Sequence, residues 1–111
     1  MKAPIPLIKG TLDVLVLQAL LWGPMHGFEI TTWLEARSGG ALDIDDSALY
    51  QALHRMEERD LIAADWGVTE NNRRARYYQL TSKGRAHLRS EASILTRYAK
   101  TITAILAERP A

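Results

Sequence analysis

Basic side chains gather in one short stretch of this 111-residue chain. Between Asn71 and Arg89 there are six basic residues and no acidic one: Arg73, Arg74, Arg76, Lys83, Arg85 and Arg89. The formal net charge of +1 hides this asymmetry, because residues 1–46 hold three basic against six acidic residues while residues 47–111 hold eleven against seven. So concentrated a patch favours a polyanionic partner, although a basic run alone can also be a solvated face.

A second set of polar side chains precedes the basic run and has the spacing of one helix face. It consists of Ser47, Tyr50, Gln51, His54 and Arg55. Glutamine can bond adenine with two hydrogen bonds, arginine can reach guanine or phosphate, and serine and tyrosine can bond phosphates near a helix N-terminus. The set therefore predicts contacts to the bases and backbone of double-stranded DNA.

No comparable set predicts catalysis or a metal site. The chain has no cysteine, which excludes disulfides, thiolate ligands and a cysteine nucleophile. The three histidines lack metal-ligand spacing, and the aspartates at 43–46 lack the glycine and closing glutamate of a calcium loop. No Ser/His/Asp arrangement or phosphate-binding glycine loop is visible. We expect no enzymatic activity, no metal and no cofactor.

The one long apolar run, Leu12 to Trp22, is too short to span a bilayer and includes Asp13 and Gln18. It also lacks the small-residue cleavage site of a signal peptide. We therefore expect no membrane partner. Together with the absence of cysteine, this favours a cytoplasmic location.

Apolar periodicity predicts three short helices ahead of the basic run. They run from about Lys9 to Trp22, from about His26 to the Ser38-Gly39-Gly40 break, and from Ser47 to Arg59. Residues 41–44 form a brief extended piece, and Asp45 or Asp46 is the expected N-cap of the third helix. That third helix carries the polar face.

Two strand-like stretches follow, Leu61–Val68 and Ala75–Leu80, joined by a polar turn over residues 69–74. They predict a β-hairpin. Asn71 and Asn72 tolerate left-handed turn geometry, and three arginines supply positive charge for DNA: Arg73, Arg74 and Arg76.

The last predicted helix, from about Ser82 to Glu108 with Thr81 as its cap, is the longest. Apolar residues recur in it at steps of four and three, at Leu88, Ala92, Leu95, Ala99, Ile102 and Leu106. Such a heptad seam requires a second helix to cover it. The cover is either a second copy of the chain, which makes the seam a dimer interface, or the domain's own core.

Three short helices, a polar-faced third helix and a basic hairpin occur in the order of a winged helix-turn-helix. We therefore predict a mainly α fold with a small β-hairpin, in which residues 1–81 bind DNA and residues 82–111 form a dimerisation helix of the same compact unit. The third helix would enter the major groove, and a two-fold dimer would read an inverted-repeat operator. The alternative is a winged-helix module that binds a protein partner and makes no specific contact with DNA.

The motifs resemble the PadR (phenolic acid decarboxylase repressor) family of bacterial transcriptional regulators. The resemblance lies in Gly10-Thr11-Leu12-Asp13, in residues 23–28, in residues 48–57, in Trp66-Gly67 and in the Asn71–Thr81 stretch. It implies a homodimeric winged-helix repressor whose last helix mediates dimerisation, and in many members a small molecule releases the DNA. Gln51 stands where proline is common in the family and adds a side chain that can read a base.

Overall fold

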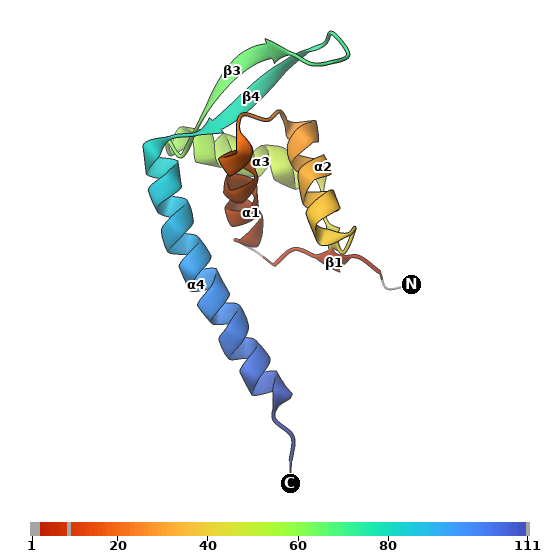
Figure 1. Ribbon diagram of the computed structural model, residues 1–111, viewed down its shortest axis with the longest axis vertical. Helices are drawn as coiled ribbons and strands as arrows, with labels where there is room; N and C mark the ends of the chain where they lie inside the picture. Colours follow the sequence, from red (N-terminus) through yellow and green to blue (C-terminus); the bar gives the residue numbers. More distant parts are fainter. Residues whose placement is uncertain (1–2, 9, 111) are drawn as a thin grey trace.

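The computed structural model describes residues 3–8 and 10–110 (Figure 1). The elements in chain order are β1 (Ile5–Pro6), α1 (Thr11–Ala19), the 3-10 turn η1 (Leu20–Trp22), α2 (Gly27–Ser38), β2 (Leu42–Asp43), α3 (Asp46–Glu58), β3 (Ile62–Val68), β4 (Arg74–Leu80) and α4 (Ser82–Ala107). The mainly helical fold with one small hairpin is thus confirmed. The predicted start of the first helix at Lys9 lies outside the described residues.

Polar side chains cap the N-termini of α3 and α4. A carboxylate oxygen of Asp45 accepts a hydrogen bond from the Ala48 amide at 3.0 Å, which makes Asp45 rather than Asp46 the N-cap of α3. Thr81 caps α4 in the predicted way, because its hydroxyl accepts from the Gly84 amide at 3.0 Å. Each cap satisfies an amide that the first turn of a helix leaves without a partner.

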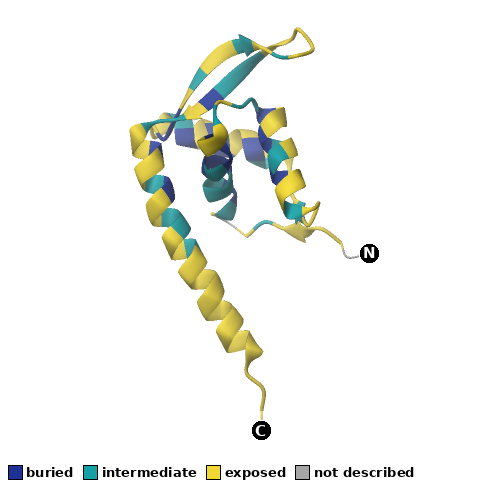
Figure 2. Ribbon diagram, in the orientation of Figure 1, coloured by how far each residue is buried: buried dark blue, intermediate teal, exposed yellow. Residues whose placement is uncertain are grey.

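The core forms where α1 packs against α2, α3 and α4. Val16 and Leu17 of α1 are completely buried, as are Ile30 of α2 and Met56 of α3. Burial is concentrated in this bundle and at the base of the hairpin (Figure 2). The core therefore fixes α3 from one side only and leaves its opposite face in solvent.

A short parallel pair joins the N-terminal segment to the loop before α3. Ile5 of β1 pairs with Leu42 of β2, and the Ile5 amide donates to the Ala41 carbonyl. The extended piece predicted for residues 41–44 is present, whereas β1 escaped prediction because a two-residue strand is too short to show alternation.

The hairpin is antiparallel and registers Ile62 with Leu80 at its base and Val68 with Arg74 at its tip. Asn72 adopts the left-handed conformation expected of a turn asparagine, with φ of 59°. Met25, which precedes α2, pairs with Tyr78 on the free edge of β4. This bridge attaches the base of the hairpin to the linker between η1 and α2.

Helix α4 extends away from the bundle and accounts for the longest dimension of the molecule, 61 Å (Figure 1). Its first turn lies tight against the chain, because a Cβ at Gly84 would stand 1.9 Å from the Leu61 carbonyl oxygen. Leu88 joins the chain's own core and Ala92 packs partly against it, whereas residues 96–107 are all exposed. Within the described part of the chain, no helix has the length and apolar character to cross a membrane.

Candidate functional site

The outer face of α3 is polar and exposed. Leu49, Leu53 and Met56 turn into the core, and the opposite side of the helix presents Ser47, Gln51 and His54 to solvent. None of these three side chains is buried against the rest of the domain, so the helix can approach a flat or grooved partner along its whole length. This arrangement is the one the sequence predicts.

Glu58 also lies on this outer face, and sequence reasoning missed it. Its carboxylate stands 2.7 Å from Nε2 of His54, with both side chains well exposed. The spacing of four residues was the available signal, since residues i and i+4 are neighbours on a helix. The face therefore presents an acidic acceptor next to the polar donors.

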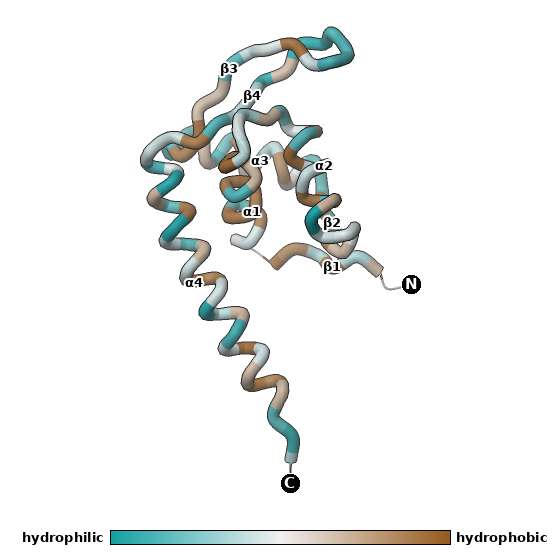
Figure 3. Tube along the Cα trace, in the orientation of Figure 1, coloured by the Kyte–Doolittle hydropathy of each residue, from teal (hydrophilic) through white to brown (hydrophobic). Residues whose placement is uncertain are grey.

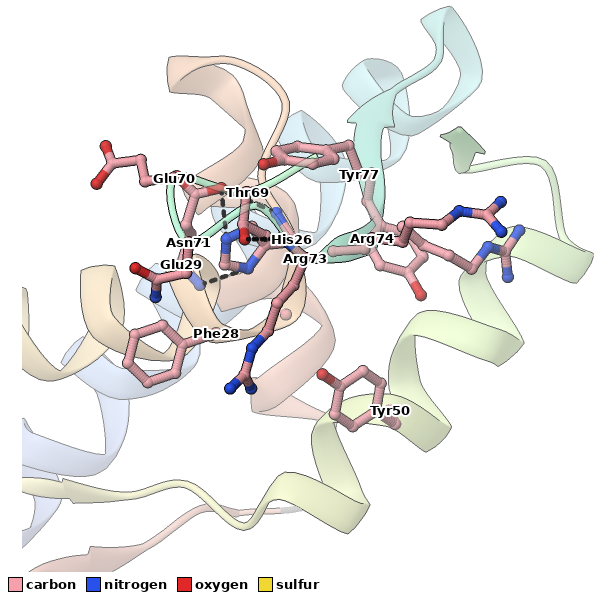
Figure 4. Close-up of a pocket in the computed structure, with 14 residues that line it drawn as sticks. His26, Phe28, Glu29, Tyr50, Thr69, Glu70, Asn71, Arg73, Arg74 and Tyr77 are labelled. Atoms are coloured by element: carbon pink, nitrogen blue, oxygen red, sulfur yellow. Dashed lines mark hydrogen bonds and ion pairs between the residues drawn. The ribbon is translucent and has the colours of Figure 1, made fainter. Parts of the chain in front are cut away.

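Tyr50 lies on the flank of α3 that faces α2 and the hairpin. Its phenol ring packs over Gly27, where an added Cβ would come within 2.5 Å of the hydroxyl oxygen. A side chain at position 27 would therefore displace the exposed end of the Tyr50 ring. Tyr50 stays half exposed and its hydroxyl points toward the first turn of α2 (Figure 4).

A hollow of about 760 Å³ separates α2, Tyr50 and the hairpin (Figure 4). His26 and Phe28 line it from α2, while Arg73 and Tyr77 line it from the hairpin side. Asn71, Arg73 and Arg74 line its hairpin rim and are exposed, and Asn72 is exposed in the same turn. The structure therefore brings the predicted hairpin residues and Tyr50 to one surface.

Arg55 projects from the other flank of α3. Its guanidinium donates to Oδ1 of Asp13 on α1 at 3.0 Å, and the side chain remains 56% exposed. The sequence predicts that Arg55 contacts guanine or phosphate, which stays a prediction; within the structure its partner is Asp13 of α1. Helical spacing alone could not show this partner, because Asp13 is 42 residues away.

Arg76 of the hairpin also forms an ion pair with a carboxylate. Its two terminal nitrogens bond both carboxylate oxygens of Glu57 on α3, at 3.2 and 2.7 Å, and its guanidinium lies 5.8 Å from the Tyr78 ring centre. The hydrogen bonds that Arg76 donates to Glu57 raise the pKa of Arg76 above its ordinary value, while burial raises the pKa of the Tyr78 phenol. Arg76 thus ties the hairpin to α3, and the predicted contact of Arg76 with DNA stays a prediction.

The exposed half of α4 carries apolar side chains on one stripe. They are Ile94, Tyr98, Ile102, Ile105 and Leu106, each between 37% and 68% exposed. Brown apolar segments recur along this part of α4 in Figure 3. The predicted seam contained two of the five residues and missed the rest, because the apolar stripe of a helix is wider than a strict heptad.

A groove of about 660 Å³ lies between this stripe and the start of α1. Ile8 and Val14 form one wall, and Leu95, Tyr98 and Ile102 form the other. Ala99 also lines it. Leu88 and Ala92 do not, because they pack on the chain's own core, which is the alternative that the sequence left open for that end of the seam.

The model of the transcriptional regulator PadR-like family matches residues 16–90. An uncharacterized protein of Lysinibacillus sphaericus is 30% identical over 82 residues, which cover 74% of this chain and 75% of the relative. A transcriptional regulator from Clostridium thermocellum has a similar structure, with a TM-score of 0.77, 25% identity and coverage of 86% of this chain and 90% of its own. A PadR family transcription regulator from Clostridium difficile R20291 gives a TM-score of 0.75 at 25% identity, over 88% and 100% of the two chains. These matches confirm the winged-helix fold with a long last helix.

Proposed function

Because this chain belongs to the PadR-like family of transcriptional regulators, whose members are regulators and not enzymes, we propose that it is a repressor that binds an inverted-repeat DNA operator as a homodimer. The observation that carries the proposal is the outer face of α3, where Ser47, Gln51 and His54 are exposed beside a basic hairpin. An α-helix is about 10 to 12 Å across, which fits a major groove about 12 Å wide.

In this proposal, α3 provides specificity for the DNA sequence, and Tyr50 and the hairpin provide most of the affinity. Gln51 reads adenine from the centre of the outer face, with Ser47 and His54 on either side of it. Tyr50 and the hairpin residues Asn71, Asn72, Arg73 and Arg74 contact the sugar-phosphate backbone, which fixes the position of the protein on DNA without reading bases. Arg55 and Arg76 act through Asp13 and Glu57 and hold α3 in place between α1 and the hairpin.

Dimerisation through α4 is supported by the apolar stripe from Ile94 to Leu106. Contiguous exposed apolar residues on a small soluble domain mark an interaction surface. The stripe continues along α4 well beyond the part that covers the chain's own core. A second copy that packs its own α4 and α1 on this stripe covers it in both subunits at once, as two-fold symmetry requires.

The groove between α1 and α4 supports release of DNA by a small apolar or aromatic molecule. Its walls are mainly aliphatic, with Tyr98 as the aromatic member. A ligand releases DNA only if it binds better to a dimer whose recognition helices are wrongly spaced for the operator. Since α4 sets that spacing in the proposed dimer, a ligand lodged against α4 is well placed to change it.

A gel-retardation assay with duplex DNA from upstream of the chain's own gene tests the proposal. We expect a retarded complex that survives competition by a scrambled duplex of the same composition, together with a footprint of two inverted half-sites. Binding that is equal for both duplexes, or absent even at low salt, would contradict it. The latter result would favour the alternative, a winged-helix module that binds a protein partner. The same chain acts in the cytoplasm in this proposal, where operator DNA is accessible.

A further inference from the structure

Two exposed apolar side chains stand next to each other on the hairpin, and nothing described so far accounts for them. Trp66 and Val68 of β3 are each 61% exposed. Alternation along a strand places residues two apart on the same face, so the pair forms one small apolar surface near the hairpin tip. Trp66 is too exposed to contribute much to the core.

The register of the hairpin shows which way this surface faces. Trp66 pairs with Arg76 across the strands, and Val68 pairs with Arg74. Directly paired residues share a face, and on this face Arg76 reaches Glu57 of α3 while Tyr78 enters the core. The surface of Trp66 and Val68 therefore lies on the side of the hairpin that faces α3, and it extends from the level of the Arg76–Glu57 contact toward the hairpin tip.

Arg74 adds a positive charge to the same surface. Its guanidinium carbon lies 4.7 Å from the centre of the Trp66 ring, which is the geometry of a cation–π contact. The indole ring thereby restrains Arg74 beside the apolar pair. The result is an apolar patch with a cation at its edge.

We propose that this surface, formed by Trp66, Val68 and Arg74, packs on the sugar-phosphate backbone of DNA alongside α3, an inference that rests on the DNA binding proposed above. DNA backbone alternates apolar deoxyribose with anionic phosphate, which complements an indole ring with a guanidinium on it. Trp66 and Val68 contact the sugars and the wall of the minor groove, while Arg74 pairs with a phosphate.

Tryptophan fluorescence tests the contact directly once Trp66 is the single fluorophore. The chain has three tryptophans, so the other two must be replaced. The double variant Trp22→Phe, Trp33→Phe leaves Trp66 as the single fluorophore. We expect addition of the upstream duplex to change its emission and to protect it from iodide quenching. The matched control is Trp33→Phe, Trp66→Phe, which leaves Trp22, a residue of nearly equal exposure at 62% on a different part of the surface. Its signal should not change on DNA addition.

Affinity and its salt dependence supply a second readout. Trp66→Ala should weaken binding about fivefold per hairpin, in line with an exposed contact of this kind, and Trp66→Phe should weaken it less. The slope of affinity against salt should stay the same in Trp66→Ala, since an apolar contact releases no counterions, and should fall by about one unit per hairpin in Arg74→Ala. Trp22→Ala should leave both quantities unchanged.

The outcomes separate this inference from the function on which it rests. If the wild-type chain binds the duplex but Trp66 shows neither a change in emission nor protection, the inference is wrong and the proposed function stands. A salt slope that drops in Trp66→Ala as far as in Arg74→Ala, with no fluorescence change, also overturns it, because Trp66 then serves only to position Arg74. If the wild-type chain binds no duplex at any salt concentration, the proposed function and this inference fall together.

Discussion

Variants of Glu57 and Arg76 test most directly whether Arg76 contacts DNA or holds the hairpin against α3. Sequence alone makes Arg76 one of three hairpin arginines that contact DNA, whereas in the structure it joins the hairpin to α3. The two roles predict different consequences for Glu57→Gln, Arg76→Gln and the double variant. In the structural role, each single change weakens the same contact, so the double variant is little worse than either.

The size of the effect follows from the geometry of the pair. Both oxygens of Glu57 are bonded, and the two side chains are only 30% and 38% exposed. Exposed ion pairs are worth about 0.2 to 1 kcal/mol, and a bidentate, partly shielded pair belongs at the upper end of that range. We expect a coupling free energy of unfolding of about 1 kcal/mol between Glu57 and Arg76, which corresponds to a fall in Tm of about 4 °C for each single variant.

Thermal and urea unfolding of the four proteins, at one fixed protein concentration, measures this coupling. Retardation at several salt concentrations measures the other role, with Arg73→Ala as the matched control for a lost phosphate contact. Suppose that the coupling is below about 0.3 kcal/mol, the uncertainty of additivity, and that Arg76→Gln lowers the salt slope as much as Arg73→Ala does. Arg76 would then contact DNA, and the reasoning from the structure would be refuted.

Four further outcomes are expected. Arg73→Ala should weaken binding to all duplexes and lower the salt slope by about two units per dimer, measured by titration across salt concentrations, with no change in Tm. Gln51→Ala should reduce discrimination between operator and scrambled duplex by about 1 to 3 kcal/mol while binding to the scrambled duplex stays the same. Ile102→Glu should yield a folded monomer of 12.5 kDa by light scattering, because Ile102 is 37% exposed in the single chain; a wild-type chain that is itself monomeric at micromolar concentration would contradict dimerisation. Ala99→Leu should reduce the response to planar aromatic compounds while operator affinity stays within about tenfold, or 1.4 kcal/mol; a screen in which no such compound shifts Tm or affinity would argue for a constitutive repressor.

Local rules predicted most of the fold correctly. The helix periods placed α2 and α3 within one residue of their observed bounds, whereas the predicted end of the first helix at Trp22 is the end of η1, three residues beyond the end of α1. Thr81 is the cap of α4, as predicted. The turn asparagine at 72 adopts positive φ as its residue type favours. These features depend on residues close together in sequence, so the sequence contains the information needed to predict them.

Features that depend on an unusual capping residue or on distant residues were harder to predict. The capping box of α2 used His26 and Glu29, in which each residue's side chain accepts from the other's amide. Sequence suggested only that a helix begins near His26, because histidine is not among the usual capping residues. Strand β1 required the tertiary contact with β2 before two residues could count as a strand.

The arginines show most clearly why local sequence alone cannot decide which candidate site residues are free to contact DNA. Arg55, Arg74 and Arg76 have the same side chain and sit in the same basic half of the chain. One bonds Asp13 across 42 residues, one bonds Glu57 across 19, and one lies on the ring of Trp66. Arg55 and Arg76 acquire their partners only when α1, α3 and the hairpin pack together, and Arg74 acquires its partner when the hairpin forms. The partner decides whether the charge is available to DNA. Arg73 and Arg74 keep their charge at the exposed rim, whereas the carboxylates of Asp13 and Glu57 offset the charges of Arg55 and Arg76. The basic run therefore overstates the number of phosphate contacts, and the salt slope of binding should follow the exposed arginines rather than the total count of basic residues.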